Sequence, residues 1–195
     1  MTEDLAHLEQ GRSQLEVYEY LAGQPSATPG TPLGGFSQRP ADNSGSAFEN
    51  NIPEAHALHF LQMATENIAK AIFLRSGNTG WDKYTHRAFS AIPHHLRARH
   101  IAARLGWRDF DAYKRFLRDV RSLCREIEEL HPQVGSIVEK ANVEYPWPGR
   151  DSLGNEIWYV PAHYSFRLLS RMRKPLGVQL IRFLHLLANR FDTIF

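Results

Sequence analysis

Cysteine is nearly absent from this chain, since Cys124 is the only one among 195 residues. A single thiol excludes an internal disulfide and any zinc site built from several cysteines. Nowhere does the chain contain about 18 consecutive uncharged apolar residues, the length that a membrane-spanning helix requires. No basic start followed by an apolar run is present, so we expect no signal peptide, no membrane contact and a cytoplasmic location.

Several catalytic and cofactor-binding motifs are also missing. The chain has no Gly-rich phosphate loop and no nucleophile elbow, which argues against P-loop nucleotide hydrolysis and against the α/β-hydrolase type of chemistry. His56 and His59 lack a second pair of ligands at a spacing that suits zinc. We therefore expect no metal ion and no cofactor. The hydrophobic content of 43% and the charged content of 23% are ordinary for a globular protein.

Charge is distributed unevenly along the chain, although the formal net charge is only +2. Residues 1–60 hold two basic and eight acidic residues, whereas residues 97–125 hold nine basic and three acidic ones. Residues 126–160 are acidic again, and residues 161–195 hold six basic residues and one acidic residue. Basic blocks of this kind can attract a polyanion, but they can equally be solvated helix faces that pair with the acidic blocks.

Composition divides the chain into three parts. Residues 1–22 have a broken apolar stripe that predicts a short N-terminal helix. Residues 23–46 contain five glycines and four prolines, so we predict a flexible linker over 23–52. A helical domain is predicted over residues 53–195, which is long enough to bury a core.

The hydrophobic pattern of this domain has a helical period. It predicts helices near 53–77, 83–92, 94–105, 109–131, 162–173 and 176–192. Between them, residues 132–161 break the period and are rich in aromatic residues, which is compatible with a short hairpin or with a packed loop. The predicted fold class is all-α, an antiparallel bundle of helices with one long aromatic-rich loop and a flexible N-terminal segment.

A polar column crosses the otherwise apolar helix near 53–77. Gln62, Glu66 and Lys70 are four residues apart, so their side chains follow one line along the helix. Glu66 precedes Lys70, the favourable orientation for an ion pair, and on a surface helix such a pair contributes only a few tenths of a kcal/mol.

The same stretch carries a family resemblance. Gln62, Ala64, Glu66, Lys70 and Ala71 lie as in the first core helix of HEPN domains (higher eukaryote and prokaryote nucleotide-binding), which this chain resembles over residues 53–192. A Thr-His pair at 85–86 and a Tyr-Pro turn at 145–146 follow in the order seen in that family. Many members have Arg before the Tyr-Pro turn, where this chain has Glu144.

The resemblance implies a function and a candidate catalytic pair. Many HEPN proteins are metal-independent endoribonucleases that use an Arg and a His four to six residues apart, paired across a symmetric dimer. Arg125 and His131 have this spacing. On a regular helix the two side chains would diverge by about 120°, and His131, just before Pro132, can instead be a helix-terminal residue.

A row of cations precedes this pair on the same predicted helix. Lys114, Arg118 and Arg121, followed by Arg125, are spaced four, three and four residues apart, so they share one face. Such a row can follow a phosphate backbone, and we assign the first three to nucleic-acid binding. The alternative is a solvated face paired with Glu128, Glu129 or the acidic N-terminal segment.

The sequence therefore leaves two main functional hypotheses. In the first, a cytoplasmic HEPN-like homodimer binds or cleaves RNA or a nucleotide, as a toxin of a toxin–antitoxin system or in phage defence. In the second, a non-catalytic HEPN module binds a protein partner, such as an antitoxin, a nucleotidyltransferase or a larger complex.

Overall fold

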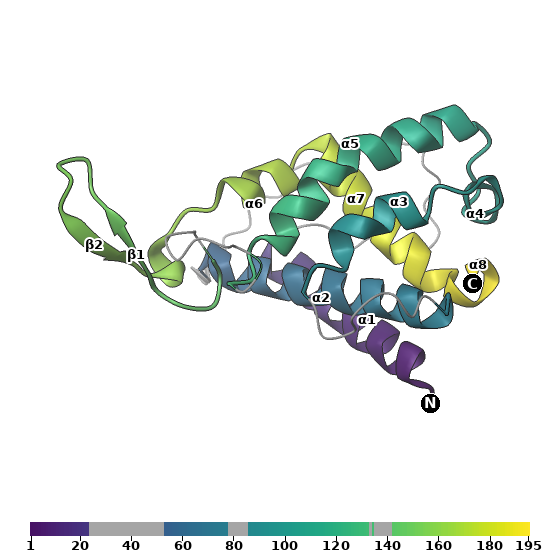
Figure 1. The fold of residues 1–195 in the computed structure, drawn as a ribbon, viewed down its shortest axis with the longest axis horizontal. Helices are drawn as coiled ribbons and strands as arrows, with labels where there is room; N and C mark the ends of the chain where they lie inside the picture. Colours follow the sequence, from purple (N-terminus) through teal and green to yellow (C-terminus); the bar gives the residue numbers. More distant parts are fainter. Residues whose placement is uncertain (24–52, 78–85, 133, 135–141) are drawn as a thin grey trace, which may run out of the picture.

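The computed structural model describes residues 1–23, 53–77, 86–132, 134 and 142–195 of the chain (Figure 1). Helices make up most of these residues, and a single two-stranded sheet is the only sheet among them. The prediction of a mainly helical fold is confirmed. The predicted linker lies outside the described residues, apart from Gly23. No helix in the described part is both long and apolar enough to cross a bilayer.

The described elements follow one another in a simple order. The longer helices are α1 (Glu3–Leu21), α2 (Glu54–Arg75), α5 (Phe110–Glu128) and α7 (Pro175–Asn189). The short helical elements are η1 (Phe89–Ala91), α3 (Ile92–His95), α4 (Arg99–Arg104), η2 (Pro161–His163), α6 (Arg167–Met172) and α8 (Phe191–Ile194). The strands are β1 (Trp147–Arg150) and β2 (Glu156–Tyr159), and they lie between α5 and η2.

Helix α1 packs along α2 in the opposite direction (Figure 1). Leu8, Leu15 and Tyr18 of α1 are at most 2% exposed and belong to the common hydrophobic core. Gly11 allows the two helices to approach closely, because a Cβ atom there would lie 2.8 Å from Ile68 Cγ1. The core therefore includes α1, which the sequence-based boundary at residue 53 left outside the domain.

Helix α5 follows its predicted apolar seam. Tyr113, Val120, Cys124 and Ile127 are all at most 1% exposed and face the core. Asp109 caps the N-terminus of the helix, because its side chain accepts hydrogen bonds from the backbone N–H groups of residues 111 and 112. The helix ends at Glu128, three residues before the predicted end.

The short helices depart from the predicted boundaries. The predicted helix 83–92 is wrong over 86–88, which are not helical, and residues 83–85 lie outside the described part. Pro93 does not end a helix but lies in the first turn of α3, where the missing N–H needs no acceptor. The predicted helix 162–173 is shorter, since α6 begins only at Arg167.

The aromatic-rich segment contains an antiparallel hairpin, one of the two alternatives that the sequence allowed. Trp147 pairs with Tyr159 and Arg150 with Glu156 in its register. The rings of Trp147 and Tyr159 contact those of Tyr164 and Phe166, which anchors the base of the hairpin. The rest of the hairpin projects from one end of the molecule (Figure 1).

Candidate functional site

The polar column of α2 is buried in the folded protein. Gln62 is 1% exposed and Glu66 is 8% exposed, so the column is not the surface ion pair of a solvated helix. Gln62 Nε2 donates to Glu66 Oε2 at 2.9 Å, and Lys70 Nζ donates to Glu66 Oε1 at 2.6 Å. Glu66 is thus the common acceptor of the column. Its burial requires these partners, because an isolated carboxylate is costly to remove from water.

Two histidines join this column from elsewhere in the chain. His86 precedes η1, and its Nδ1 lies 2.8 Å from Glu66 Oε2. The ring of His86 stacks on the ring of His131, with centroids 3.4 Å apart and an angle of 15° between the planes. His131 Nε2 lies 3.7 Å from Glu144 Oε1. We call these six residues the histidine cluster: Gln62, Glu66, Lys70, His86, His131 and Glu144.

The surroundings set the charge of the cluster. Burial lowers the pKa of His131, and the neighbouring His86 lowers it further, while Glu144 and Glu66 act in the opposite direction. For Glu66, burial raises the pKa, but hydrogen bonds from Lys70 and His86 outweigh it, and the net pKa is lowered. At neutral pH the cluster therefore combines an ionised carboxylate with a largely neutral imidazole, which can accept or donate a proton.

The predicted pair of Arg125 and His131 does not share one environment. Arg125 is exposed on α5, whereas His131 lies beyond the helix end and is 7% exposed. The ring contact and ion pair described for His131 are with His86 and Glu144. His131 thus has His86, from outside α5, as a stacked neighbour. The only sequence signal for His86 was its place in the Thr-His pair, and no chemical role was predicted for it.

The predicted basic row lines a surface hollow between α3 and α5. Lys114, Arg118 and Arg121 all border this hollow, which has a volume of about 420 Å³. Arg97 and Arg115, which were not predicted as site residues, add two further cations. We call it the basic hollow, and its other lining residues are Pro93, His94, Asp111 and Leu117.

The cations of the basic hollow are only partly neutralised. Lys114 Nζ lies 2.7 Å from Asp111 Oδ1, and Arg118 Nε lies 3.2 Å from Asp119 Oδ1. Within the described part of the chain, no ion pair is found for Arg97 or Arg121. Arg115 also has a partner, since its guanidinium lies 3.7 Å from Asp109 Oδ2. Three of the five lining cations are therefore paired with an aspartate, and an excess of positive charge remains.

One proposed acidic partner of the row has another role. Glu128 is 6% exposed, and its Oε1 accepts a hydrogen bond of 3.3 Å from the backbone N–H of Ser90. Burial raises the pKa of this carboxyl group. Glu128 thus binds the start of η1 and does not neutralise the exposed cations.

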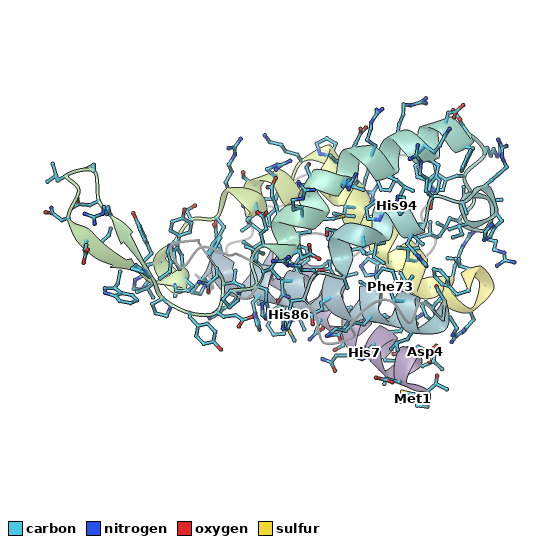
Figure 2. The ribbon with its side chains drawn as sticks, in the orientation of Figure 1. Met1, Asp4, His7, Phe73, His86 and His94 are labelled. Atoms are coloured by element: carbon cyan, nitrogen blue, oxygen red, sulfur yellow. The ribbon has the colours of Figure 1, made fainter. Side chains whose placement is uncertain are left out.

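The histidine cluster and the basic hollow are separate places on the molecule. Figure 2 labels His86 of the cluster and His94 of the hollow, and they lie apart in the view. The described residues contain no group of three or more His, Cys, Asp or Glu side chains that could hold a metal ion.

Comparisons of the chain with models of protein families, with curated proteins and with solved structures find no significant match. The HEPN resemblance therefore stays a prediction from the sequence.

Proposed function

We propose that this protein is a HEPN-like helical module that binds RNA through the basic hollow. The observation that carries the proposal is the gathering of five cationic side chains around one concavity. Three of these cations form the predicted row, Lys114, Arg118 and Arg121. The other two, Arg97 and Arg115, line the same hollow but were not predicted.

Exposure and shape support a phosphate ligand. The side chains of Arg115 and Arg118 are 58% and 73% exposed, so they can reach a ligand without a change in the fold. Guanidinium groups bind phosphate oxygens in a bidentate manner, and a concave cationic surface follows a nucleic-acid backbone. Because the contacts are to phosphates, we expect tolerance of RNA sequence and sensitivity to salt.

The test is the salt dependence of RNA binding. Changing Lys114, Arg118 and Arg121 together to Glu should abolish binding of a single-stranded RNA, because three phosphate contacts become repulsive. The matched control changes three exposed arginines that do not line the hollow, Arg108, Arg167 and Arg182, to Glu. Equal losses in the two triple variants, or wild-type binding that does not depend on salt, would contradict the proposal.

RNA cleavage is the second candidate function, and the stacked histidines favour it. General acid–base cleavage needs side chains that can give and take a proton, and His131 and His86 supply two stacked imidazoles, with His86 Nδ1 2.8 Å from Glu66 Oε2. Under this hypothesis the catalytic partner of His131 is His86, whereas the family resemblance implies Arg125. Catalysis at the cluster would also require the RNA to reach His131.

Single substitutions separate the two forms of the cleavage hypothesis. If the histidine pair acts, His131→Ala and His86→Ala should each remove cleavage, whereas Arg125→Ala should leave it nearly unchanged. Cleavage should also survive a metal chelator. If Arg125→Ala abolishes cleavage instead, the pair implied by the family resemblance is correct. RNA binding without any cleavage favours the non-catalytic module, with an antitoxin or nucleotidyltransferase among its proposed partners.

A further inference from the structure

The cations of the basic hollow differ in how they are neutralised. Lys114, Arg115 and Arg118 each lie within 3.7 Å of an aspartate oxygen. In the part of the chain that the structure describes, neither Arg97 nor Arg121 has an ion pair, and both side chains are exposed. The positive charge that the protein leaves uncompensated in the hollow is therefore concentrated on two guanidinium groups.

These two arginines border the hollow from two different elements. Arg97 follows α3, whereas Arg121 lies on α5, and these two helices pack against each other (Figure 1). A ligand in the hollow can thus meet one guanidinium group from each side. Because a guanidinium presents several N–H donors in one plane, the pair is suited to a single group with several acceptor oxygens.

The neighbouring aspartates disfavour a long anionic strand along α5. Asp109 caps this helix and Asp111 and Asp119 lie on it, and their side chains are 63%, 72% and 51% exposed. A series of phosphates that followed the helix would pass close to these carboxylates and be repelled. The lining cations of α5, from Lys114 to Arg121, also extend over only about 10 Å of the helix axis. The hollow therefore suits one compact anion better than a long stretch of backbone.

A nucleobase would find little to contact in the hollow. Pro93 and Leu117 line it, but both side chains are buried, so they offer almost no apolar surface to a ring. Bases of single strands bind mainly by stacking on aromatic side chains. Among the described residues that line the hollow, the imidazole of His94 is the only aromatic ring. The ligand is therefore recognised by its charge and its oxygens.

The terminal phosphate of an RNA has the matching properties. A phosphate inside the strand is a diester with one negative charge. A terminal phosphate is a monoester, which has a charge of about −2 at neutral pH and three acceptor oxygens. The two uncompensated guanidinium groups of Arg97 and Arg121 can neutralise such a dianion, whereas one diester would leave part of their charge without a partner.

We propose that the basic hollow binds a terminal phosphate of RNA, with Arg97 and Arg121 donating hydrogen bonds to its oxygens, so that this protein recognises RNA ends. The inference rests on the proposed function, because it names the part of the RNA that occupies the hollow. The paired cations Lys114, Arg115 and Arg118 then contact the nucleotides next to that end.

The experiment compares one short single-stranded RNA in three forms: with a 5′-phosphate, with a 3′-phosphate, and with hydroxyl groups at both ends. Fluorescence anisotropy, with a dye attached inside the strand, measures the dissociation constant of each form for the full chain. We expect a phosphorylated form to bind about 10-fold more tightly than the hydroxyl form, because one additional hydrogen bond between charged groups changes binding by about that factor. The form that gains affinity identifies the end.

Paired and unpaired arginines provide a matched control. Arg97→Gln and Arg121→Gln should each reduce the preference for the phosphorylated RNA to less than about 3-fold, because each removes a guanidinium group that faces the terminal phosphate. Arg118→Gln removes a cation that Asp119 already neutralises, so it should weaken all three forms to a similar extent and keep the preference. All three arginines are exposed, so the melting temperatures should stay near that of the wild-type protein.

Inorganic phosphate tests whether the RNA strand itself is needed. It should displace the phosphorylated RNA only at concentrations far above the dissociation constant of that RNA, because the rest of the strand adds contacts with the other cations. Inorganic phosphate that binds as tightly as the phosphorylated RNA would indicate a site for a small phosphate, and this result would overturn the proposal.

The remaining outcomes separate this proposal from the preceding one. If the wild-type chain binds all three forms equally well, the proposed function stands and recognition of the end is wrong. A preference that persists in both Arg97→Gln and Arg121→Gln also overturns it, because the terminal phosphate then lies outside the hollow. If no form of the RNA binds, the proposed function itself fails and this inference fails with it.

Discussion

The histidine cluster and the basic hollow both gather charged side chains, but they do so under opposite conditions. In the cluster, Glu66 is almost fully buried and accepts hydrogen bonds from Lys70 and Gln62, with His86 beside it. In the hollow, Arg118 is 73% exposed and has a single aspartate neighbour. Buried charges must be satisfied by the protein itself, whereas exposed cations keep water as their partner until a ligand replaces it.

This difference separates stability from binding. Removing a member of the cluster leaves a buried charge without its partner, so the cost appears in the free energy of unfolding. Removing a cation of the hollow leaves no buried charge without a partner, so the free energy of unfolding changes little. The loss appears in the affinity for a polyanion. Three predictions test this division, in order of expected effect on stability.

The largest effect is expected for Glu66→Gln. The substitution keeps the shape of the side chain but removes the charge that Lys70 and His86 face. We expect the free energy of unfolding to fall by about 3 kcal/mol, as for other buried ion pairs that lose one partner. Denaturant titration at pH 7 measures it.

The matched control for that variant is Glu9→Gln. Glu9 also pairs with a cation on its own helix, Arg12, at 2.6 Å, but its side chain is 60% exposed. Its loss should cost less than about 0.5 kcal/mol, since exposed pairs contribute little. If the two variants are destabilised equally, burial of the column is not what distinguishes it from a surface pair.

A smaller effect is expected from pH. The pKa of His131 is lowered in the folded state, chiefly by burial, so the unfolded chain binds its proton more readily. The stabilisation from neutral His131 is complete above its unfolded pKa of about 6.5 and is lost as the pH falls below that value. The pKa of Glu66 is also lowered, so its contribution is lost only below about pH 4.5, the ordinary pKa of the group.

Thermal unfolding between pH 7.5 and pH 5, at about half-unit steps, tests this assignment. His131→Phe should flatten the loss of stability on acidification, because it keeps a stacking ring but cannot bind a proton. Some slope should persist, since burial also lowers the pKa of His95. His100→Phe, at an exposed position, is the control and should reproduce the wild-type slope. An unchanged slope in His131→Phe would show that the stacked ring does not titrate in this range.

The smallest effect on stability is expected in the hollow. Arg118→Gln and Arg121→Gln should each change the free energy of unfolding by less than about 0.5 kcal/mol, because neither side chain is buried. Each should nevertheless weaken RNA binding and reduce the slope of log K against log salt by about 0.7, the loss of one contact to a single strand. A large shift in melting temperature with no change in RNA affinity would show that these arginines contribute to stability and not to RNA binding.

The sequence determined the helical class and the apolar seams. The period of Tyr113, Val120, Cys124 and Ile127 predicted the buried face of α5, because a regular helix repeats every 3.6 residues whatever surrounds it. For the same reason the spacing of Lys114, Arg118 and Arg121 placed three cations on one exposed face. Local rules of this kind depend only on neighbours in the chain.

Contacts between distant segments were decided by the tertiary structure. The stack of His86 on His131 joins residues 45 positions apart, and the contact of His86 with Glu66 joins residues 20 positions apart. Arg97, which follows α3, lines the hollow together with cations of α5. The local periodicity of the sequence does not predict such pairs, because they depend on which helix faces pack against one another in the folded core. The packing of distant segments also placed α1 in the core. The apolar stripe of α1 is weak in the sequence, and it is the close approach of α2 at Gly11 that buries Leu15.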